Sequence, residues 1–370
     1  MQNVIGLMSG TSMDGVDVAW LRTDGRARIA PGPAMTVPYR DDERAAVRAV
    51  LGINPSAFKD GGAFAAAVTA VTQAHIRTIE TFLAAHPGLH TKADLIGFHG
   101  QTTFHDPENG VTVQIGDAER LAAHFGLPVV SDFRTADVAA GGQGAPFAPL
   151  YHAALASVLP RPLAVLNLGG VGNVTWMSGA DDILAFDTGP ASALIDDWVL
   201  RQTGQAFDRD GALAATGQPD QARITDWLSA PYFAAPPPKS LDRQSFEADV
   251  AGMSAADGAA TLTRFTVLSV ARALGHLPEA PHRWLVTGGG RHNGHMMRSL
   301  AEELQAPVDP VEAVGWDGDA LEAQAFAWLA VRSLEGLPLS VPGTTGVSAP
   351  CPGGRLSQPP AAISARRRST

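Results

Sequence analysis

The stretch that decides the fold lies near the start of the chain, at residues 4–19: Val4-Ile5-Gly6-Leu7-Met8-Ser9-Gly10-Thr11-Ser12-Met13-Asp14-Gly15-Val16-Asp17-Val18-Ala19. An apolar run breaks into a turn of small and polar residues, and apolar and polar side chains then alternate. This pattern predicts a strand, a turn and a returning strand. The turn offers glycines, hydroxyls and backbone N–H groups that are able to hold phosphates. An ordinary hairpin turn is the alternative interpretation.

The composition predicts a folded protein of two domains. The chain has 370 residues, of which 45% are hydrophobic and 17% charged, so it is able to bury a large core. The formal charge, 27 − 37 = −10, argues against broad nucleic-acid binding. The single cysteine, Cys351, excludes an intrachain disulfide and a cysteine zinc cluster. Because neither a signal peptide nor a run of about 18 apolar residues is present, we expect a cytoplasmic protein without membrane contact.

The opening pattern returns at residues 163–176, where another apolar run meets a glycine turn and a returning strand. Helical spacing predicts helices over residues 41–51, 63–85, 116–125, 149–158, 191–203, 255–274 and 320–334, with another from residue 293. Short apolar runs predict strands over residues 94–98, 111–115, 127–132, 183–186 and 284–287. Strands that alternate with helices favour an α/β protein of two related halves, with a ligand in the cleft between them.

A glycine-rich joint at residues 140–146 suggests where the two halves divide. We therefore expect one domain over residues 1–135 and a second over residues 136–341. The chain beyond residue 342 is rich in Pro, Gly and Ser and ends in an arginine run, so we expect residues 342–370 to form a largely poorly ordered tail.

Four glycine-rich turns follow apolar strands, at Gly10, Gly169, Gly189 and Gly288. Together they favour a nucleoside triphosphate whose phosphates the first two turns clasp, while the turn at Gly288 lets the backbone approach the nucleoside. Carboxylates at Asp14 and Asp17 offer oxygen ligands for Mg²⁺. The alternative is an α/β protein that needs these glycines only for tight turns. The ordinary P-loop pattern and the H-E-x-x-H pattern are both absent from the sequence.

Several polar residues follow predicted strands or open predicted helices. Asp187 comes at the end of a strand, where a carboxylate lies at the lip of a cleft, although a helix N-cap or a turn residue is the alternative. His99 and His105 flank a polar run, but each histidine alone is more often structural. Glu322 opens the last helix, where an acid also favours the helix dipole. Lys239 follows three prolines and is either a phosphate contact or part of an exposed loop.

An ordered set of motifs resembles those of the anhydro-N-acetylmuramic acid kinases. The set comprises residues 6–17, 99–102, 132–134, 141–146, 167–173, 186–190, 237–240, 287–290 and 322–327. The match runs from about Val4 to Gly346, nearly the whole chain. Ala191-Ser192 depart from the Gly-Asn of many members, and Leu241-Asp242-Arg243-Gln244 depart from their Thr-Gly-Arg-Glu.

The resemblance implies a two-domain actin-like ATPase (ribonuclease H-like) fold with an interdomain cleft. It implies a bacterial enzyme of cell-wall recycling that uses ATP, Mg²⁺ and water. Its substrate would be 1,6-anhydro-N-acetylmuramic acid and its product N-acetylmuramic acid 6-phosphate. A homodimer is compatible with it. Two other functions stay open: a nucleotide-dependent binding protein that uses the fold as a switch, and a kinase of an ordinary sugar.

By the same resemblance, Asp187 matches the catalytic base, and Thr102 and Glu322 match sugar-binding positions. Asp14 is the candidate for contact with Mg²⁺ through ATP. The residues assigned to ATP binding are Gly10, Thr11, Ser12, Met13, Asp14, Gly15, Val16, Asp17, Gly169, Gly170, Asn173, Gly288, Gly289 and Gly290.

Overall fold

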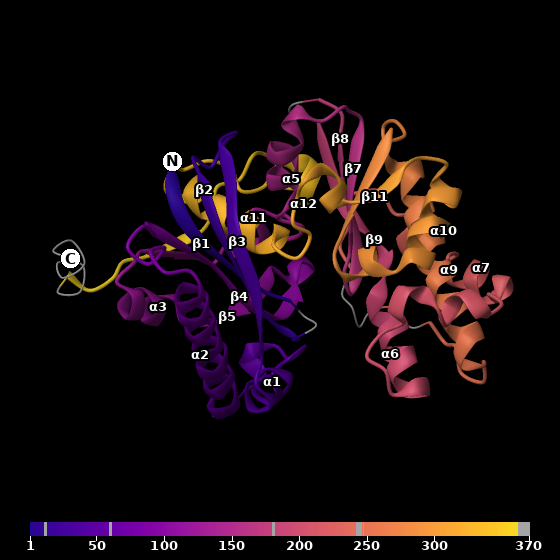
Figure 1. Ribbon diagram of the computed structural model, residues 1–370, viewed down its shortest axis with the longest axis horizontal. Coiled ribbons are helices and arrows are strands. Elements are labelled where there is room, and N and C mark those ends of the chain that lie inside the picture. Colours follow the sequence, from indigo (N-terminus) through magenta and orange to yellow (C-terminus); the bar gives the residue numbers. More distant parts are fainter. Residues whose placement is uncertain (11–12, 59–60, 180–181, 242–245, 247, 362–370) are drawn as a thin grey trace. The chain divides into compact units, whose positions relative to one another are not determined.

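The computed structural model describes residues 1–10, 13–58, 61–179, 182–241, 246 and 248–361. The chain divides into two compact units (Figure 1). The first unit comprises residues 1–157 and returns from residue 319 onward, and the second comprises Val158–Gly318.

The first unit is built on a mixed seven-stranded sheet. Its path runs β12-β6-β4-β1-β2-β3, and β5 pairs with β4. β1 is antiparallel to β2 and parallel to β4, while β2 is antiparallel to β3 and β4 is parallel to β6. The strands are β1 (Gln2–Ser9), β2 (Gly15–Thr23), β3 (Ile29–Pro38), β4 (Leu95–Asp106), β5 (Val111–Ile115), β6 (Val129–Ser131) and β12 (Arg355–Ser357).

Helices pack on this sheet because successive side chains of a strand point to opposite faces. Ile5 and Leu7 of β1 share a core with Ile79 and Phe82 of α2. The helices of the unit are α1 (Asp41–Arg48), α2 (Gly62–Ala85), α3 (Ala118–Phe125), α4 (Thr135–Ala139), α5 (Pro149–Leu155), α11 (Leu321–Leu334) and α12 (Pro342–Thr345).

Glycines let α11 lie directly on the sheet. Gly6 and Gly97 are partners in the β1–β4 ladder. An added Cβ would lie 1.9 Å from the Ala323 carbonyl oxygen at Gly6, and 2.3 Å from the Phe326 carbonyl oxygen at Gly97. Figure 1 shows this yellow helix, from the far end of the sequence, beside the indigo strands.

The second unit is built on a five-stranded sheet with the path β11-β10-β7-β8-β9. Its strands are β7 (Leu163–Leu168), β8 (Val171–Met177), β9 (Ile183–Pro190), β10 (Arg283–Thr287) and β11 (Val308–Pro310). Its helices are α6 (Ser192–Thr203), α7 (Gln221–Trp227), α8 (Pro231–Ala234), α9 (Ala255–Ala273) and α10 (Gly294–Leu304). Its core joins alternate residues of β7, such as Leu166, to Trp198 of α6, Leu262 of α9 and Leu300 of α10.

Short 3-10 helices complete both units. They are η1 (Pro55–Ala57), η2 (Pro107–Asn109), η3 (Ala156–Val158), η4 (Arg209–Gly211), η5 (Ala214–Thr216), η6 (Leu274–His276), η7 (Gly289–His292) and η8 (Val311–Val314).

The two sheets share one strand order. Three antiparallel strands lead to two parallel ones, as β3-β2-β1-β4-β6 in the first unit and as β9-β8-β7-β10-β11 in the second. This is the order of the ribonuclease H-like unit, which actin-like ATPases contain twice. The prediction of an α/β fold with two related halves is confirmed.

The limits of the units differ from the domains expected at residues 135/136 and 341/342. The compact units divide at residues 157/158 and 318/319. The reason is that α11 packs on β1, β2 and β4, which returns the end of the chain to the first unit. The expected tail also differs: α12 forms at residues 342–345, and Arg355–Ser357 pairs antiparallel with β6. The arginine run at residues 366–368 lies outside the described residues.

Candidate active site

The turn between β1 and β2 is held at Gly10 and Met13. The Met13 N–H donates to the Gly10 carbonyl oxygen at 3.1 Å, and Met13 adopts a φ of 55°, which is uncommon for a residue with a side chain. Gln101 donates its Nε2–H to the same carbonyl at 3.0 Å. Thr11 and Ser12, the hydroxyl residues assigned to phosphate binding, lie outside the described residues.

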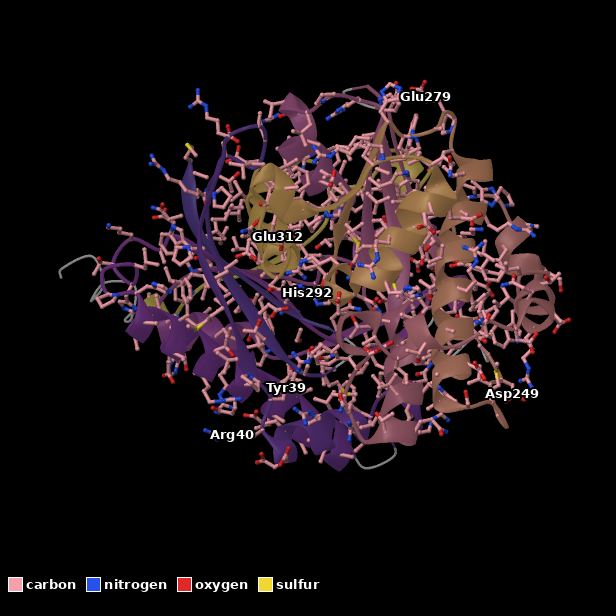
Figure 2. The ribbon with its side chains drawn as sticks, turned by 45° about the vertical axis from the view of Figure 1, so that its right-hand side comes forward. Tyr39, Arg40, Asp249, Glu279, His292 and Glu312 are labelled. Atoms are coloured by element: carbon pink, nitrogen blue, oxygen red, sulfur yellow. The ribbon has the colours of Figure 1, made fainter. Side chains whose placement is uncertain are left out.

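Three side chains that the sequence analysis gave no role hold this turn. Gln101 is fully buried, and its Oε1 accepts the Tyr39 hydroxyl at 3.3 Å. Arg44 donates to the Met13 carbonyl oxygen at 3.0 Å. Tyr39, labelled in Figure 2 beside Arg40, is buried, and burial raises its pKa to about 12. The one signal of this support in the sequence was Gln101 itself, an amide in the polar run that follows the short apolar run at residues 94–98.

Two residues assigned to ATP binding have side chains that serve the core. Val16 is fully buried with the residues that pack against α2, and Met13 packs with Val47 and Val71. The side chains at these two positions therefore belong to the core and are not available to contact a ligand.

Acidic side chains gather beside the turn. Asp17 is buried enough that desolvation raises its pKa to about 7. The Thr36 hydroxyl, which donates to Asp17 at 2.6 Å, opposes the rise, and the charges of Glu322, Asp14 and Asp319 add to it. The Asp14 side chain is exposed and accepts the Gly15 N–H at 2.9 Å. The first unit thus brings together Asp14, Asp17 and Glu322, all of which the sequence analysis singled out.

Thr102 lies on β4 near the same turn. It follows Gln101, which is opposite Ser9 in the β1–β4 ladder. Its hydroxyl accepts the Gln114 Nε2–H at 3.3 Å, beside a register shift in the β4–β5 ladder. Both candidate sugar-binding residues, Thr102 and Glu322, therefore belong to the first unit.

The second unit packs its glycine turns against one another. The Gly169 carbonyl oxygen, between β7 and β8, accepts the Ser192 N–H at the start of α6, at 2.9 Å. Gly288 has a φ of +76°, and a Cβ there would lie 2.4 Å from the Asn167 Oδ1 atom. A Cβ at Gly289 would meet nothing within 4 Å, so the bare backbone there faces open space. The main chain at Gly289 is therefore not covered by neighbouring residues on that side.

A buried arginine holds the turn at Gly288. The Arg291 side chain donates to the Gly288 carbonyl oxygen at 3.0 Å and to Glu312 at 2.9 Å. Figure 2 labels Glu312 on η8 and His292 at the end of η7. The sequence analysis assigned Arg291 no role, because its partner Glu312 lies 21 residues further along the chain.

Asp187 lies within β9, in a row of polar residues that crosses three strands. Asn167 of β7 is opposite Asn173 of β8, which is opposite Asp187. A register shift follows in the β8–β9 ladder, between Gly172 and Asn173. β9 continues to Pro190 and the N-cap of α6 is Ala191, so the helix-cap alternative for Asp187 is wrong.

A proline-rich loop is bound to Asp187, whose side chain is 8% exposed. The Leu241 N–H donates to its Oδ2 atom at 2.8 Å and orients the carboxylate. The Asp187 N–H donates to the Lys239 carbonyl oxygen at 3.0 Å, and the Tyr232 hydroxyl donates to the Asp187 carbonyl oxygen at 2.6 Å. Burial, and then the charge of Asp187, raise the pKa of Tyr232.

The structure thus gathers the predicted residues into two sets. One, in the first unit, lies around the β1–β2 turn with Thr102 and Glu322. The other, in the second unit, comprises Gly169, Gly170, Asn173, Asp187 and Gly288–Gly290. Among the described residues, no group of three or more His, Cys, Asp or Glu is placed to hold a metal ion. Within the same part of the chain, no helix has the length and apolar character to cross a bilayer.

Comparison with known proteins gives matches along most of the chain. A family model described as anhydro-N-acetylmuramic acid kinase matches residues 2–358. A protein of that name from Acidiphilium cryptum (strain JF-5) is 53% identical and covers 96% of this chain and 98% of its own length. Another from Rhodospirillum rubrum is 55% identical and covers 95% and 92%, respectively. Among solved structures, the Acidaminococcus fermentans (R)-2-hydroxyglutaryl-CoA dehydratase component A has a TM-score of 0.48 at 12% identity, covering 90% of this chain and 100% of that one.

Proposed function

Because the chain belongs to the anhydro-N-acetylmuramic acid kinase family, we propose that it opens the ring of 1,6-anhydro-N-acetylmuramic acid with water and phosphorylates O6 from ATP. The product is N-acetylmuramic acid 6-phosphate. The supporting observation is Asp187, a nearly buried carboxylate that a backbone N–H orients at the edge of three polar strand positions.

The chemistry needs one base rather than the acid and base of an ordinary glycosidase. Water attacks the anomeric carbon while Asp187 takes its proton, and the C1–O6 bond breaks with its electron pair on O6. Where a glycosidase protonates the leaving oxygen, O6 here attacks the γ-phosphorus of ATP and ADP departs. The reaction then adds one water and one phosphoryl group to the sugar.

Glycine turns bind the nucleotide in this proposal. The backbone of the β1–β2 turn and of the Gly169-Gly170 turn would contact phosphates, since glycine lets a ligand approach the main chain. The open face at Gly289 fits the nucleoside. Phosphoryl transfer depends mainly on positioning and on neutralising charge, so a fixed backbone cradle suits it.

The exposed carboxylate of Asp14 fits Mg²⁺, a hard cation that proteins bind through one or two carboxylates together with substrate phosphates. When bound, the ion would neutralise phosphate charge. Thr102 and Glu322 would bind the hydroxyl and amide groups of the sugar by hydrogen bonds.

The same proposal assigns a cytoplasmic role in cell-wall (murein) recycling, because the substrate is a fragment of that polymer. Two other functions would give different products. A kinase of an ordinary sugar would add phosphate without water, and a nucleotide-dependent switch protein would hydrolyse ATP without any sugar.

The decisive test measures ADP release from Mg·ATP with three sugars in parallel: 1,6-anhydro-N-acetylmuramic acid, N-acetylmuramic acid and glucose. Mass spectrometry of the product then counts what was added. We expect ADP release only with the anhydro sugar, and a product that gained both water and phosphate. Phosphorylation of either ordinary sugar would mean that the substrate is not the anhydro sugar. ADP release independent of sugar would favour the switch protein.

A further inference from the structure

Lys239 is a half-buried lysine whose ammonium group binds the neighbouring helix. Its Nζ atom lies 2.9 Å from the Tyr232 carbonyl oxygen and 3.5 Å from that of Phe233, both on α8. The same atom lies 4.8 Å from the ring centre of Tyr232 and 5.7 Å from that of Phe186. Carbonyl oxygens and aromatic faces both attract a cation, so these contacts stabilise the protonated amine, while the burial of the side chain opposes them.

The main chain around Lys239 meets the proposed catalytic carboxylate. The Lys239 carbonyl oxygen accepts the Asp187 N–H, and two residues later the Leu241 N–H binds the Asp187 carboxylate. Tyr232, at the other end of the loop, binds the Asp187 carbonyl oxygen through its hydroxyl. The loop over residues 231–241 therefore contacts Asp187 from both of its ends, and the Lys239 side chain joins those ends.

We propose that Lys239 is a positioning residue that holds the Leu241 N–H against the Asp187 carboxylate by tying the end of this loop to α8. Lys239 acts through Asp187 and does not itself touch the reacting atoms. The kinetic part of this inference rests on the proposed function, since it takes Asp187 as the base.

The strength of the contacts between the Lys239 ammonium group and α8 depends on pH. Burial lowers the pKa of Lys239 to about 8. The titratable side chains that its ammonium group faces are Tyr232, whose ring centre lies 4.8 Å away, and His276 of η6, whose Nε2 atom lies 3.4 Å from Nζ, while Asp187 meets Lys239 through a main-chain hydrogen bond. Because the His276 Nε2 atom lies closer to the Phe233 carbonyl oxygen, at 3.0 Å, it acts as a donor there. A neutral amine at position 239 still has two N–H donors for the α8 carbonyl oxygens, but it loses the charge that strengthens those hydrogen bonds and the attraction to both rings.

The kinetic test compares Lys239→Met, which removes the charge, with Lys239→Arg, which keeps it, and uses Lys92→Met in an exposed loop as the matched control. We expect Lys239→Met to lower kcat by ~10–100-fold with KM for the sugar nearly unchanged, because a small displacement of a base costs that much. In the wild type kcat should fall as the pH rises through about 8. That decline should move to higher pH in Lys239→Arg and vanish in Lys239→Met.

A second measurement does not depend on activity. Hydrogen exchange of the peptide that contains Leu241 should speed up by ~10-fold in Lys239→Met, since its amide loses a fixed partner, and should remain slow in Lys239→Arg and Lys92→Met. Unchanged exchange in Lys239→Met would overturn the positioning role, as would a kcat within threefold of the wild type across the pH range. If the wild type fails to turn over the anhydro sugar, the proposed function fails, while the exchange result still decides the role of Lys239.

Discussion

At the scale of single residues, Asp187 has the clearest consequence. Asp187→Asn keeps an oxygen that is able to accept the Leu241 N–H, so the loop should stay in place. The amide cannot take a proton from water, and we expect turnover to fall by ~10²–10⁴-fold, the usual contribution of a general base. Steady-state kinetics and a thermal melt check both statements. The control is Asp226→Asn, the same chemical change at an exposed position on α7. Turnover within threefold of the wild type would remove Asp187 from the mechanism.

Asp17 should destabilise the folded protein when it is charged. Its folded-state pKa, about 7, lies above the ordinary aspartate pKa of 3.8, so the unfolded chain loses this proton first as the pH rises. At low pH the carboxyl is protonated in both states and does not destabilise the fold. The free energy of unfolding then falls as the pH rises from about 3.8 to about 7, where the folded protein also loses the proton. Asp17→Asn should therefore raise the melting temperature at about pH 8 by several degrees, and by less at about pH 5. An equal effect at both pH values would show that burial does not shift this carboxyl.

Some residues of the site are recognisable from local sequence patterns, and others only from the structure. Asp187, Asp14 and Asp17 stand out because each is a carboxylate beside a glycine turn after an apolar strand. Gln101 and Arg291 act through partners far along the chain, Gly10 and Glu312, and no local pattern reveals such pairs. Lys239 was noted but assigned to phosphate contact or an exposed loop, because its binding to α8 follows from tertiary packing.

At the scale of elements, the close packing of α11 on β1 depends on Gly6. An alanine there would bring its Cβ to 1.9 Å from a carbonyl oxygen of α11, which is main chain and unable to rotate away. Gly6→Ala should therefore lower the free energy of unfolding by about 3 kcal/mol, the upper range for an overpacked core. Urea unfolding measures the change. Gly62→Ala at the start of α2 is the control, because a Cβ there meets nothing within 4 Å and should change stability by less than about 1 kcal/mol.

The sequence predicted helices and strands correctly where the hydrophobic periodicity was strong. The predictions failed where a strand depends on pairing with residues far along the chain. The two strand–turn–strand units and the long helices were expected near their observed places. The expected end of the strand at residue 186 came too early: β9 continues to Pro190 across a register shift, which no pattern in its own sequence marks. The strand at Arg355–Ser357 was missed because its stability comes from pairing with β6, while its surroundings are rich in Pro and Gly.

At the scale of the whole molecule, a repeat of architecture was visible in the sequence but its boundaries were not. Both halves begin with an apolar strand, a glycine turn and a returning strand, and both sheets share one strand order. The first unit is discontinuous, because α11 packs onto β1 some three hundred residues after that strand. A search of the sequence for a single linker finds one boundary, whereas a unit made of two separate segments has two boundaries.

Buried histidines should make the first unit sensitive to acid. His75, His99 and His152 all lie in it and are at most 3% exposed. His75 donates from Nδ1 to the Val71 carbonyl oxygen at 2.7 Å, and its buried Nε2 has no partner among the described residues. Burial lowers the pKa of His75 and of His152 to about 4, and that of His99 well below its usual range. All three are therefore neutral in the folded protein at neutral pH.

The sign of the pH effect follows from which state binds protons first. Below about pH 6.5 the unfolded chain protonates these imidazoles while the folded protein does not, so stability falls until the folded pKa near 4 is reached. At about pH 5 each buried histidine should lower the free energy of unfolding by about 2 kcal/mol relative to neutral pH. Urea unfolding at the two pH values measures this loss. His75→Met should remove about 2 kcal/mol of this acid-induced loss, and His90→Gln at an exposed position is the control variant. An equal loss in His75→Met and in the wild type would mean that His75 is already charged in the fold, with a proton on the Nε2 atom that packing leaves without a partner.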